Sequence, residues 1–170
     1  GLVATRKLCE KDIPVNHTVG FSARQNYIIA RIAKPQFVNV FLSRLNAFVA
    51  QNDLGDGSYV GEKATLASQR AVRQLRESEH TSARQIGASL CSGQVIYDLA
   101  GLDVMTMPAS VAEETMQMSS QGKQFEDNTA RDYSPGITNA EDIEKFGIDT
   151  LWAISDKLVD CVEKFEKEDI

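Results

Sequence analysis

Short apolar segments alternate with longer amphipathic segments along the chain. Four of the short segments have the pattern of buried or half-buried strands, at residues 15–21, 37–42, 84–89 and 104–107. A helix is predicted after each of them, because apolar residues then recur every three to four positions. Strands that alternate with helices usually form parallel sheets with helical crossover connections. The pattern therefore predicts an α/β fold.

Local signals set several helix boundaries. Further helices are expected over residues 2–11 and 63–77, and one long final helix is expected over 138–170, after a polar loop over 121–137. The spacing of a capping box, a hydroxyl followed three residues later by Glu or Gln, occurs before three of the predicted helices. These pairs are Ser22 and Gln25, Ser110 and Glu113, and Thr138 and Glu141.

The length restricts the choice of α/β architecture. The chain has 170 residues, whereas a complete eight-stranded β/α barrel needs at least about 200. Four strand-helix units would therefore form only part of a barrel. An open doubly wound sheet would fit the length, but no strand-to-helix turn carries the GxGxxG or GxxxxGK(S/T) phosphate loop expected there. We expect one domain over residues 1–170.

Composition and charge exclude several classes of protein. Apolar residues make up 42% of the chain and charged residues 25%, as in a compact soluble domain. No apolar run is long enough to span a membrane, and a net charge of -6 disfavours nucleic-acid binding. The three cysteines lack paired or zinc-type spacing, which favours free thiols and a cytoplasmic location. No metal site is predicted, because the acidic turn at 53–57 lacks EF-hand spacing.

Polar residues interrupt two neighbouring predicted strands. Alternation over 15–21 places Asn16 and Thr18 on the face opposite His17, and Asn39 lies within an otherwise apolar strand. Strands buried on both sides of a parallel sheet are normally apolar throughout. Buried polar side chains need hydrogen-bond partners, which a structural network or a ligand can supply. Because two strands share this feature, we expect a site there, with all three polar side chains on the axis side of the barrel.

Four short motifs stand in order along the first 114 residues. They are Asn-His-Thr-Val-Gly-Phe-Ser at 16–22, Phe-Leu-Ser-Arg-Leu at 41–45, Gly-Ala-Ser at 87–89 and Leu-Ala-Gly-Leu-Asp-Val-Met-Thr at 99–106. Together they resemble the fifth to eighth strand motifs of the transaldolase family. The resemblance implies a (β/α)₈ barrel of TIM type, of which this chain supplies about four strand-helix units, from the fourth helix onward, and C-terminal helices.

The same resemblance implies a chemistry and a set of site residues. The family forms a lysine Schiff base with a ketose phosphate and moves a dihydroxyacetone unit to an aldose phosphate, in the pentose phosphate pathway. Asn16, Thr18 and Asn39 would support catalysis by ordering water and substrate hydroxyls around the Schiff base. Arg44 and Ser89 would bind the sugar phosphate, to which a guanidinium offers a planar pair of donors. The resemblance implies no cofactor.

The lysines of the chain do not match the family's Schiff-base lysine. That lysine lies on the family's fourth strand, which would precede Gly1, so it is expected upstream of this chain. The lysines at positions 7, 11, 34 and 63 fall in predicted helices or loops. A solvated ammonium group there is a poor nucleophile at pH 7. The 170 residues alone are therefore expected to be inactive.

Three further positions depart from the family pattern. Asn39 stands where the family commonly has serine, and Ser43 stands where it has glycine. Cys91 replaces an arginine of the phosphate site. Losing that arginine would remove a charge-assisted contact and weaken phosphate binding, or the thiol would take its place.

Two functional hypotheses follow. In the first, the chain is the C-terminal half of a transaldolase-type enzyme whose partners are sugar phosphates and the missing N-terminal half of the barrel. In the second, it is a non-catalytic half-barrel that binds sugar phosphates or assembles with copies of itself, because four strands leave two unpaired sheet edges. Neither hypothesis involves nucleic acid or a membrane.

Overall fold

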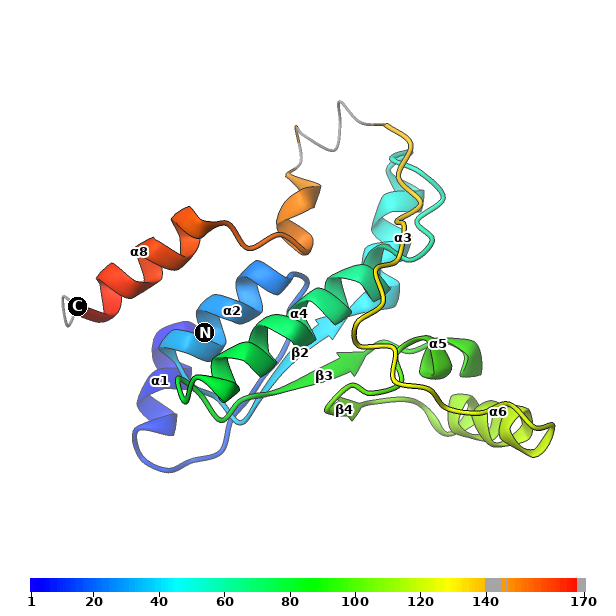
Figure 1. Ribbon diagram of the computed structural model, residues 1–170, viewed down its shortest axis with the longest axis horizontal. Helices are drawn as coiled ribbons and strands as arrows, with labels where there is room; N and C mark the ends of the chain where they lie inside the picture. Colours follow the sequence, from blue (N-terminus) through cyan, green and yellow to red (C-terminus); the bar gives the residue numbers. More distant parts are fainter. Residues whose placement is uncertain (140–144, 146, 168–170) are drawn as a thin grey trace.

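A four-stranded parallel sheet forms the centre of the molecule. The structure, a computed structural model, describes residues 1–139, 145 and 147–167. The strands β1 (Asn16–His17), β2 (Phe37–Phe41), β3 (Arg84–Ala88) and β4 (Val104–Met105) pair in parallel in the order β1-β2-β3-β4. Helices lie between consecutive strands (Figure 1). The predicted α/β fold, part of a parallel β/α barrel, is confirmed.

The helices begin and end close to the expected positions in the first two thirds of the chain. Ser22 and Ser92 accept hydrogen bonds from the backbone N–H groups of Gln25 and Val95, so both hydroxyls are N-caps. No helix within the described residues is long and apolar enough to cross a membrane. The helices in this part of the chain are α1 (Leu2–Cys9), α2 (Ala23–Ile32), α3 (Leu42–Gln51), α4 (Val60–Glu77), α5 (Gly93–Asp98) and α6 (Ala109–Ser120).

The predicted capping box at Ser110 is wrong. Helix α6 begins at Ala109, its N-cap is Pro108, and no side chain caps it. Pro108 has an extended backbone with φ of -70° and ψ of 159°, which proline adopts readily. Ser110 and Glu113 therefore both lie inside the helix.

Strand β1 is shorter than the expected segment over 15–21. Val19 has a φ of +63°, a left-handed conformation that β-branched residues rarely adopt. The chain leaves the strand after His17, and Val19 is exposed instead of facing the helices. Gly20 then passes so close to β2 that a Cβ atom there would lie 2.1 Å from the carbonyl oxygen of Asn39. Glycine is therefore required at position 20.

The core lies between the sheet and helices α2 and α4, which cover one face of it (Figure 1). Val38 packs with Tyr27 of α2 and Leu75 of α4, and Val40 packs in a neighbouring cluster with Val60. Both strand valines are fully buried. Because side chains alternate along a strand, Asn39 between them is directed to the opposite face. In a closed barrel that face lines the interior.

The single long helix expected over 138–170 is interrupted. A 3-10 helix, η1 (Ile148–Leu151), is followed by an irregular segment and then by helix α8 (Asp156–Lys167). Trp152 packs with the Val40 cluster, whereas Ile154 and Leu158 pack with the Val38 cluster. One straight helix would not place these side chains in both clusters. Of the residues assigned to the beginning of that helix, Glu141, Ile143 and Phe146 lie outside the described residues.

Residues 123–139 contain neither helix nor strand and run over α4 toward α3 (Figure 1). Two basic side chains of α4 bind this segment. Lys63 Nζ lies 2.8 Å from Asp132 Oδ1, and Arg70 Nη1 lies 3.2 Å from the Thr129 carbonyl oxygen. The segment is thereby tied to the outer side of the helix layer.

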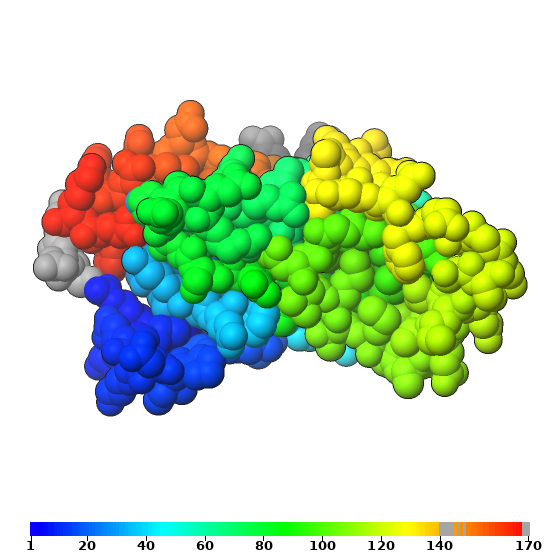
Figure 2. Space-filling view, turned by 60° about the horizontal axis from the view of Figure 1, so that its bottom comes forward, coloured from blue at the N-terminus to red at the C-terminus, as the bar shows by residue number. Residues whose placement is uncertain are grey.

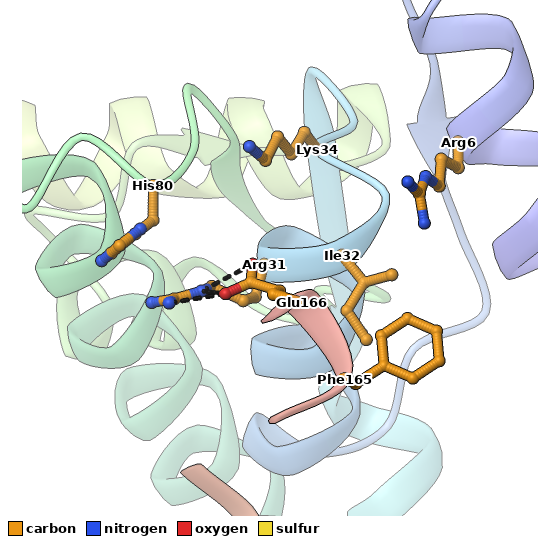
Figure 3. A pocket seen from close by; sticks show the side chains of 7 residues that line it. All are labelled: Arg6, Arg31, Ile32, Lys34, His80, Phe165 and Glu166. Carbon is orange, nitrogen blue, oxygen red and sulfur yellow. Dashed lines mark hydrogen bonds and ion pairs between the residues drawn. The ribbon is translucent and has the colours of Figure 1, made fainter. Parts of the chain in front are cut away.

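Helix α8 is docked on α2 by an ion pair. Arg31 Nε lies 2.8 and 2.7 Å from the two carboxylate oxygens of Glu166 (Figure 3). The hydrogen bond from Arg31 holds the pKa of Glu166 below its ordinary value. Val162 on the same helix is buried in the Val38 cluster. An apolar contact and a charged contact together fix the end of the described chain.

The sheet has an open edge at either side within the described residues. β1 pairs only with β2, and β4 pairs only with β3. Figure 2 shows the α1 region and the α5–α6 region at opposite ends of the molecule. The four units thus form an incomplete barrel with two exposed strand edges.

Candidate functional site

Asn16 and Asn39 form a hydrogen-bonded pair on the face of the sheet turned away from α2 and α4. The Asn39 side-chain nitrogen donates to Asn16 Oδ1 at 2.5 Å and to the His17 carbonyl oxygen at 3.0 Å. Asn39 is buried, whereas Asn16 is exposed. This pair presents a polar surface that a hydroxylated ligand can bind.

Thr18 lies just beyond the end of β1 and is exposed. The following residue, Val19, has the left-handed backbone conformation described above. Thr18 therefore belongs to the loop at the carboxyl end of β1. It follows Asn16 of the Asn16–Asn39 pair by two positions.

The carboxyl ends of β2 and β3 meet at Ser89. The Ser43 hydroxyl donates to the Ser89 carbonyl oxygen at 2.5 Å, and the Cys91 thiol lies 3.5 Å from the same oxygen. Ser89 has a φ of +63°. The structure thus brings Ser89 and Cys91 together, and it adds Ser43, which was identified only as a departure from the family pattern.

Arg44 is directed to a different place from Ser89. It is exposed and lines a cavity of about 440 Å³ together with the apolar side chains of Phe21, Phe48 and Leu151. Among the described residues, no hydrogen bond joins Arg44 to Ser89 or Cys91. Both positions still follow the carboxyl ends of adjacent strands, β2 and β3.

Asp103 has a structural role. Arg76 of α4 binds both of its carboxylate oxygens, at 2.6 and 2.9 Å, and the Gln85 backbone N–H donates to it at 3.0 Å. Burial alone would raise the pKa of Asp103, but these hydrogen bonds bring the pKa below its ordinary value. Asp103 therefore ties the turn before β4 to α4 as a carboxylate.

A group of basic residues gathers at the other end of α2. Arg6, Lys34 and His80 surround the Arg31–Glu166 pair (Figure 3). Lys34 follows the C-terminal end of α2, where a cation offsets the negative end of the helix dipole, and His80 follows the C-terminal end of α4. These charges are explained by helix termini and by the docking of α8, and they lie away from the carboxyl ends of the strands.

The lysines lie where the sequence predicted. Lys7, Lys11 and Lys34 are exposed. Lys63 on α4 is bound by Asp132, and its ammonium group lies 5.4 Å from the centre of the Trp152 ring. Lys63 is thus engaged by a carboxylate and the other three side chains stand in solvent, so none of these four amines lies in the dry pocket that a Schiff-base lysine needs.

Sequence reasoning missed a buried polar cluster on the helix side of the sheet. Asn26 on α2, Ser68 on α4 and Gln85 on β3 are all fully buried and hydrogen-bonded to one another. In the sequence, Asn26 directly follows the capping Gln25 and precedes the apolar run of α2. A polar residue at a core-facing position was the available signal, but only the fold shows that the three residues meet.

A parallel β/α sheet with polar side chains at the carboxyl ends of its strands is typical of β/α barrels that bind small molecules at that end. The model of the transaldolase/fructose-6-phosphate aldolase family matches residues 1–169, and the chain belongs to this family. No curated protein matches the chain. Family membership indicates an activity of the transaldolase or aldolase type.

Proposed function

We propose that this chain contributes the C-terminal half of a transaldolase-type barrel. The complete enzyme would transfer a dihydroxyacetone unit between sugar phosphates through a lysine Schiff base. The lysine would come from a part of the barrel outside these 170 residues. The observation that carries the proposal is the Asn16–Asn39 pair on the interior face of two adjacent strands in a chain of this family.

The proposed roles follow from what each side chain can donate or accept. The lysine amine attacks the ketose carbonyl, and loss of water leaves the imine. Asn16, Asn39 and Thr18 would order the water and the substrate hydroxyls during these proton transfers, since amides and hydroxyls both donate and accept hydrogen bonds. The carbon–carbon bond then breaks, the aldose phosphate leaves, and the remaining three-carbon enamine attacks an acceptor aldehyde.

Arg44, Ser89 and Cys91 would receive the phosphate. Arg44 is exposed and carries no ion pair within the described residues, so its guanidinium is available to a phosphate. The Ser89 hydroxyl adds a donor. Cys91 adds a thiol in place of a charged group, which makes this end of the site less positive than two arginines would.

Borohydride trapping tests this proposal. The full-length gene product is incubated with fructose 6-phosphate, reduced with borohydride and analysed by mass spectrometry and peptide mapping. We expect a stable adduct on a lysine outside the 170 residues. We expect Asn16→Ala to slow its formation at least about tenfold, whereas Asn52→Ala, an exposed position at the end of α3, leaves it unchanged.

The isolated 170-residue chain provides the second arm. It should form no adduct with fructose 6-phosphate or dihydroxyacetone. An adduct on Lys34 or Lys63 would show that the proposed placement of the lysine is wrong. Sugar-phosphate binding by the full-length protein without any adduct or transfer would support the non-catalytic half-barrel instead.

A further inference from the structure

Three fully buried polar side chains occupy the layer between the sheet and its two covering helices. Asn26 comes from α2, Ser68 from α4 and Gln85 from β3. They are flanked by the apolar clusters around Val38 and Val40. Burying amide and hydroxyl groups in such surroundings is unfavourable unless they are hydrogen-bonded to one another.

The hydrogen bonds within the cluster converge on the amide nitrogen of Asn26. This nitrogen lies 2.9 Å from Ser68 Oγ, 3.2 Å from Gln85 Oε1 and 2.9 Å from the backbone carbonyl oxygen of Asn39. The Ser68 hydroxyl donates to Gln85 Oε1 at 2.6 Å, and Gln85 Nε2 donates to the Ile86 carbonyl oxygen at 2.8 Å. The cluster is thus linked to the backbone of both central strands.

The bond to Asn39 replaces a missing partner in the sheet. The pairing of β1 with β2 ends at His17 and Val38, one residue before Asn39. Gly20 lies against the Asn39 carbonyl oxygen, where a Cβ atom would be only 2.1 Å away. The Asn26 side chain donates to this oxygen from the helix layer, so a backbone group at the irregular end of β1 is satisfied.

Asn39 is therefore held from two sides. On the helix side its carbonyl oxygen accepts from Asn26, and on the interior side its amide donates to Asn16 and to the His17 carbonyl oxygen. A rotation of the Asn39 backbone would disturb both sets of hydrogen bonds, because the carbonyl oxygen and the side-chain amide belong to the same residue. The Asn39 residue thus links the buried cluster to the interior amide pair.

We propose that Asn26, supported by Ser68 and Gln85, is a positioning residue for the Asn16–Asn39 pair. This inference rests on the proposed function, because it assigns Asn39 a place in the site. Asn26 acts through the Asn39 peptide and does not contact substrate. The competing explanation is that the cluster contributes only to the stability of the packed helices.

Activity of the full-length gene product distinguishes these explanations. Asn26→Leu keeps the approximate volume and removes the donor. The expected result is a loss in kcat of between about tenfold and a hundredfold, with KM for the sugar phosphate changed by less than about twofold. Thr65→Val is the matched control, because Thr65 is equally buried on α4 but donates only to the Gly61 carbonyl of its own helix.

A double-mutant cycle isolates the route through Asn39. In an Asn39→Ala background, Asn26→Leu should reduce kcat no further. Independent, multiplying losses would contradict the proposal, and so would a kcat loss no larger than that of Thr65→Val. A purely structural cluster would lower thermal stability in both backgrounds and give multiplying losses.

Asn26→Asp gives a second readout if Asn26→Leu does not fold. Its shape is retained, and a protonated carboxyl can still donate to the Asn39 carbonyl, whereas a carboxylate cannot. Activity of this variant should therefore fall with rising pH relative to the unmodified protein. A pH profile parallel to that of the unmodified protein would overturn the proposal.

The side-chain amide resonances of Asn16 and Asn39 test the positioning without reference to activity. They should shift in Asn26→Leu and stay in place in Thr65→Val. If the full-length protein shows neither transfer nor adduct, the proposed function fails, and these resonances alone decide whether Asn26 positions the pair. Unchanged resonances would overturn the inference.

Discussion

Single residues at the carboxyl ends of β2 and β3 differ in how firmly they are held. Ser43 and Ser89 are joined by a short hydrogen bond through the Ser89 carbonyl. Arg44, one residue after Ser43, is exposed beside an apolar cavity. Because Arg44 has many rotamers and no ion pair with any described residue, its side chain is able to turn toward an incoming phosphate. We therefore propose that anion binding at this end depends mainly on Arg44.

The first prediction concerns this arginine and the cysteine near it. Arg44→Ala in the full-length gene product should nearly abolish sugar-phosphate binding and leave folding intact. Cys91→Arg should tighten binding by a factor of about ten to a hundred, since a charge-assisted hydrogen bond contributes about 1.5–3 kcal/mol. Calorimetric titration with a sugar phosphate measures both effects.

Arg84→Ala is the control for these variants, because Arg84 is exposed at the opposite end of β3. The affinity of Arg84→Ala for the sugar phosphate should equal that of the unmodified protein. Unchanged affinity in both Arg44→Ala and Cys91→Arg would mean that the phosphate is not bound at the ends of β2 and β3.

The second prediction concerns a buried carboxyl group. Glu62 near the start of α4 is 4% exposed, and Asn46 Nδ2 donates to its two oxygens at 3.0 and 3.3 Å. Burial raises the pKa of Glu62, so folding favours the protonated form. The stabilisation by protonated Glu62 is fully present at pH values below the pKa of this carboxyl in the unfolded chain. It is lost as the pH rises through the higher pKa of the carboxyl in the folded chain.

Glu62→Gln should therefore raise the free energy of unfolding at pH 7 and remove this part of the pH dependence. The glutamine oxygen can still accept from Asn46. Denaturant titrations between pH 4 and pH 8 measure the effect, with the exposed Glu113→Gln as control. A lower stability of Glu62→Gln at pH 7 would show that the ionised carboxylate is favourable in the fold.

At the scale of elements, ends are decided by contacts with other elements. Strand β1 stops at His17, where Val19 turns the backbone and Gly20 approaches β2. The final helix is divided because Trp152 and Ile154 pack in different core clusters. Helix α8 then lies on α2, where Arg31 and Glu166 join.

The third prediction concerns the docking of α8. Glu166→Gln leaves the largely buried Arg31 without its counter-ion and should weaken docking by about 1–3 kcal/mol. Hydrogen exchange of the α8 amides should become faster, whereas Asp160→Asn, an exposed change on the same helix, should leave it unaltered. Equal exchange in both variants would assign docking to Val162 alone.

Acid should have the same effect as Glu166→Gln. The folded pKa of Glu166 is lowered by Arg31, so its contribution is present above the unfolded pKa and is lost as the pH falls through the folded pKa. The protection of α8 should therefore decrease at low pH in the unmodified protein. In Glu166→Gln this acid-dependent change should be smaller.

At the scale of the whole molecule, four strand-helix units form an open arc. β1 and β4 each have one unpaired edge within the described residues. The interior face carries the Asn16–Asn39 pair, which lies in the surface that other strands of a barrel would cover. We therefore expect that completion of the sheet would stabilise the chain and close the proposed site.

The fourth prediction follows from these edges. The isolated 170-residue chain should form dimers or larger assemblies, because unpaired strand edges bind other strand edges. Sedimentation velocity over a range of concentrations measures this association. The full-length gene product should show less of it. A monodisperse, folded monomer of the 170-residue chain would contradict the expectation.

Sequence reasoning predicted the types and order of the elements correctly over residues 1–120. Helical spacing and strand alternation are short-range properties, so they are visible without knowledge of the fold. The cap at Ser22 was found for the same reason, since its partner Gln25 is three residues away. The cap at Ser110 was wrong because Pro108 also fits a helix start, and local spacing does not rank the two.

The sequence predicted which residues belong to the candidate site, but it did not predict how all of their side chains are arranged in space. Asn16 and Asn39 were identified because polar residues stand out in apolar strands. The register pairs Asn16 with Phe37, and a side-chain hydrogen bond then joins Asn16 to Asn39 two residues further along β2. The cluster of Asn26, Ser68 and Gln85 was missed because its members are far apart in the sequence and lie on three different elements. The direction of Arg44 likewise depends on the helix that carries it.

The amino-acid sequence by itself determined the α/β alternation, the parallel sheet and the polar positions on its strands, because each depends on neighbours within a few residues. The tertiary structure alone decided where β1 ends, where the last helix is interrupted and which polar groups share the space beneath Asn39. Those features depend on contacts across tens of residues: Gly20 against Asn39, Trp152 and Ile154 in separate clusters, and Asn26 beside Gln85. A local pattern does not contain the distances between such residues, since packing of the whole chain sets them.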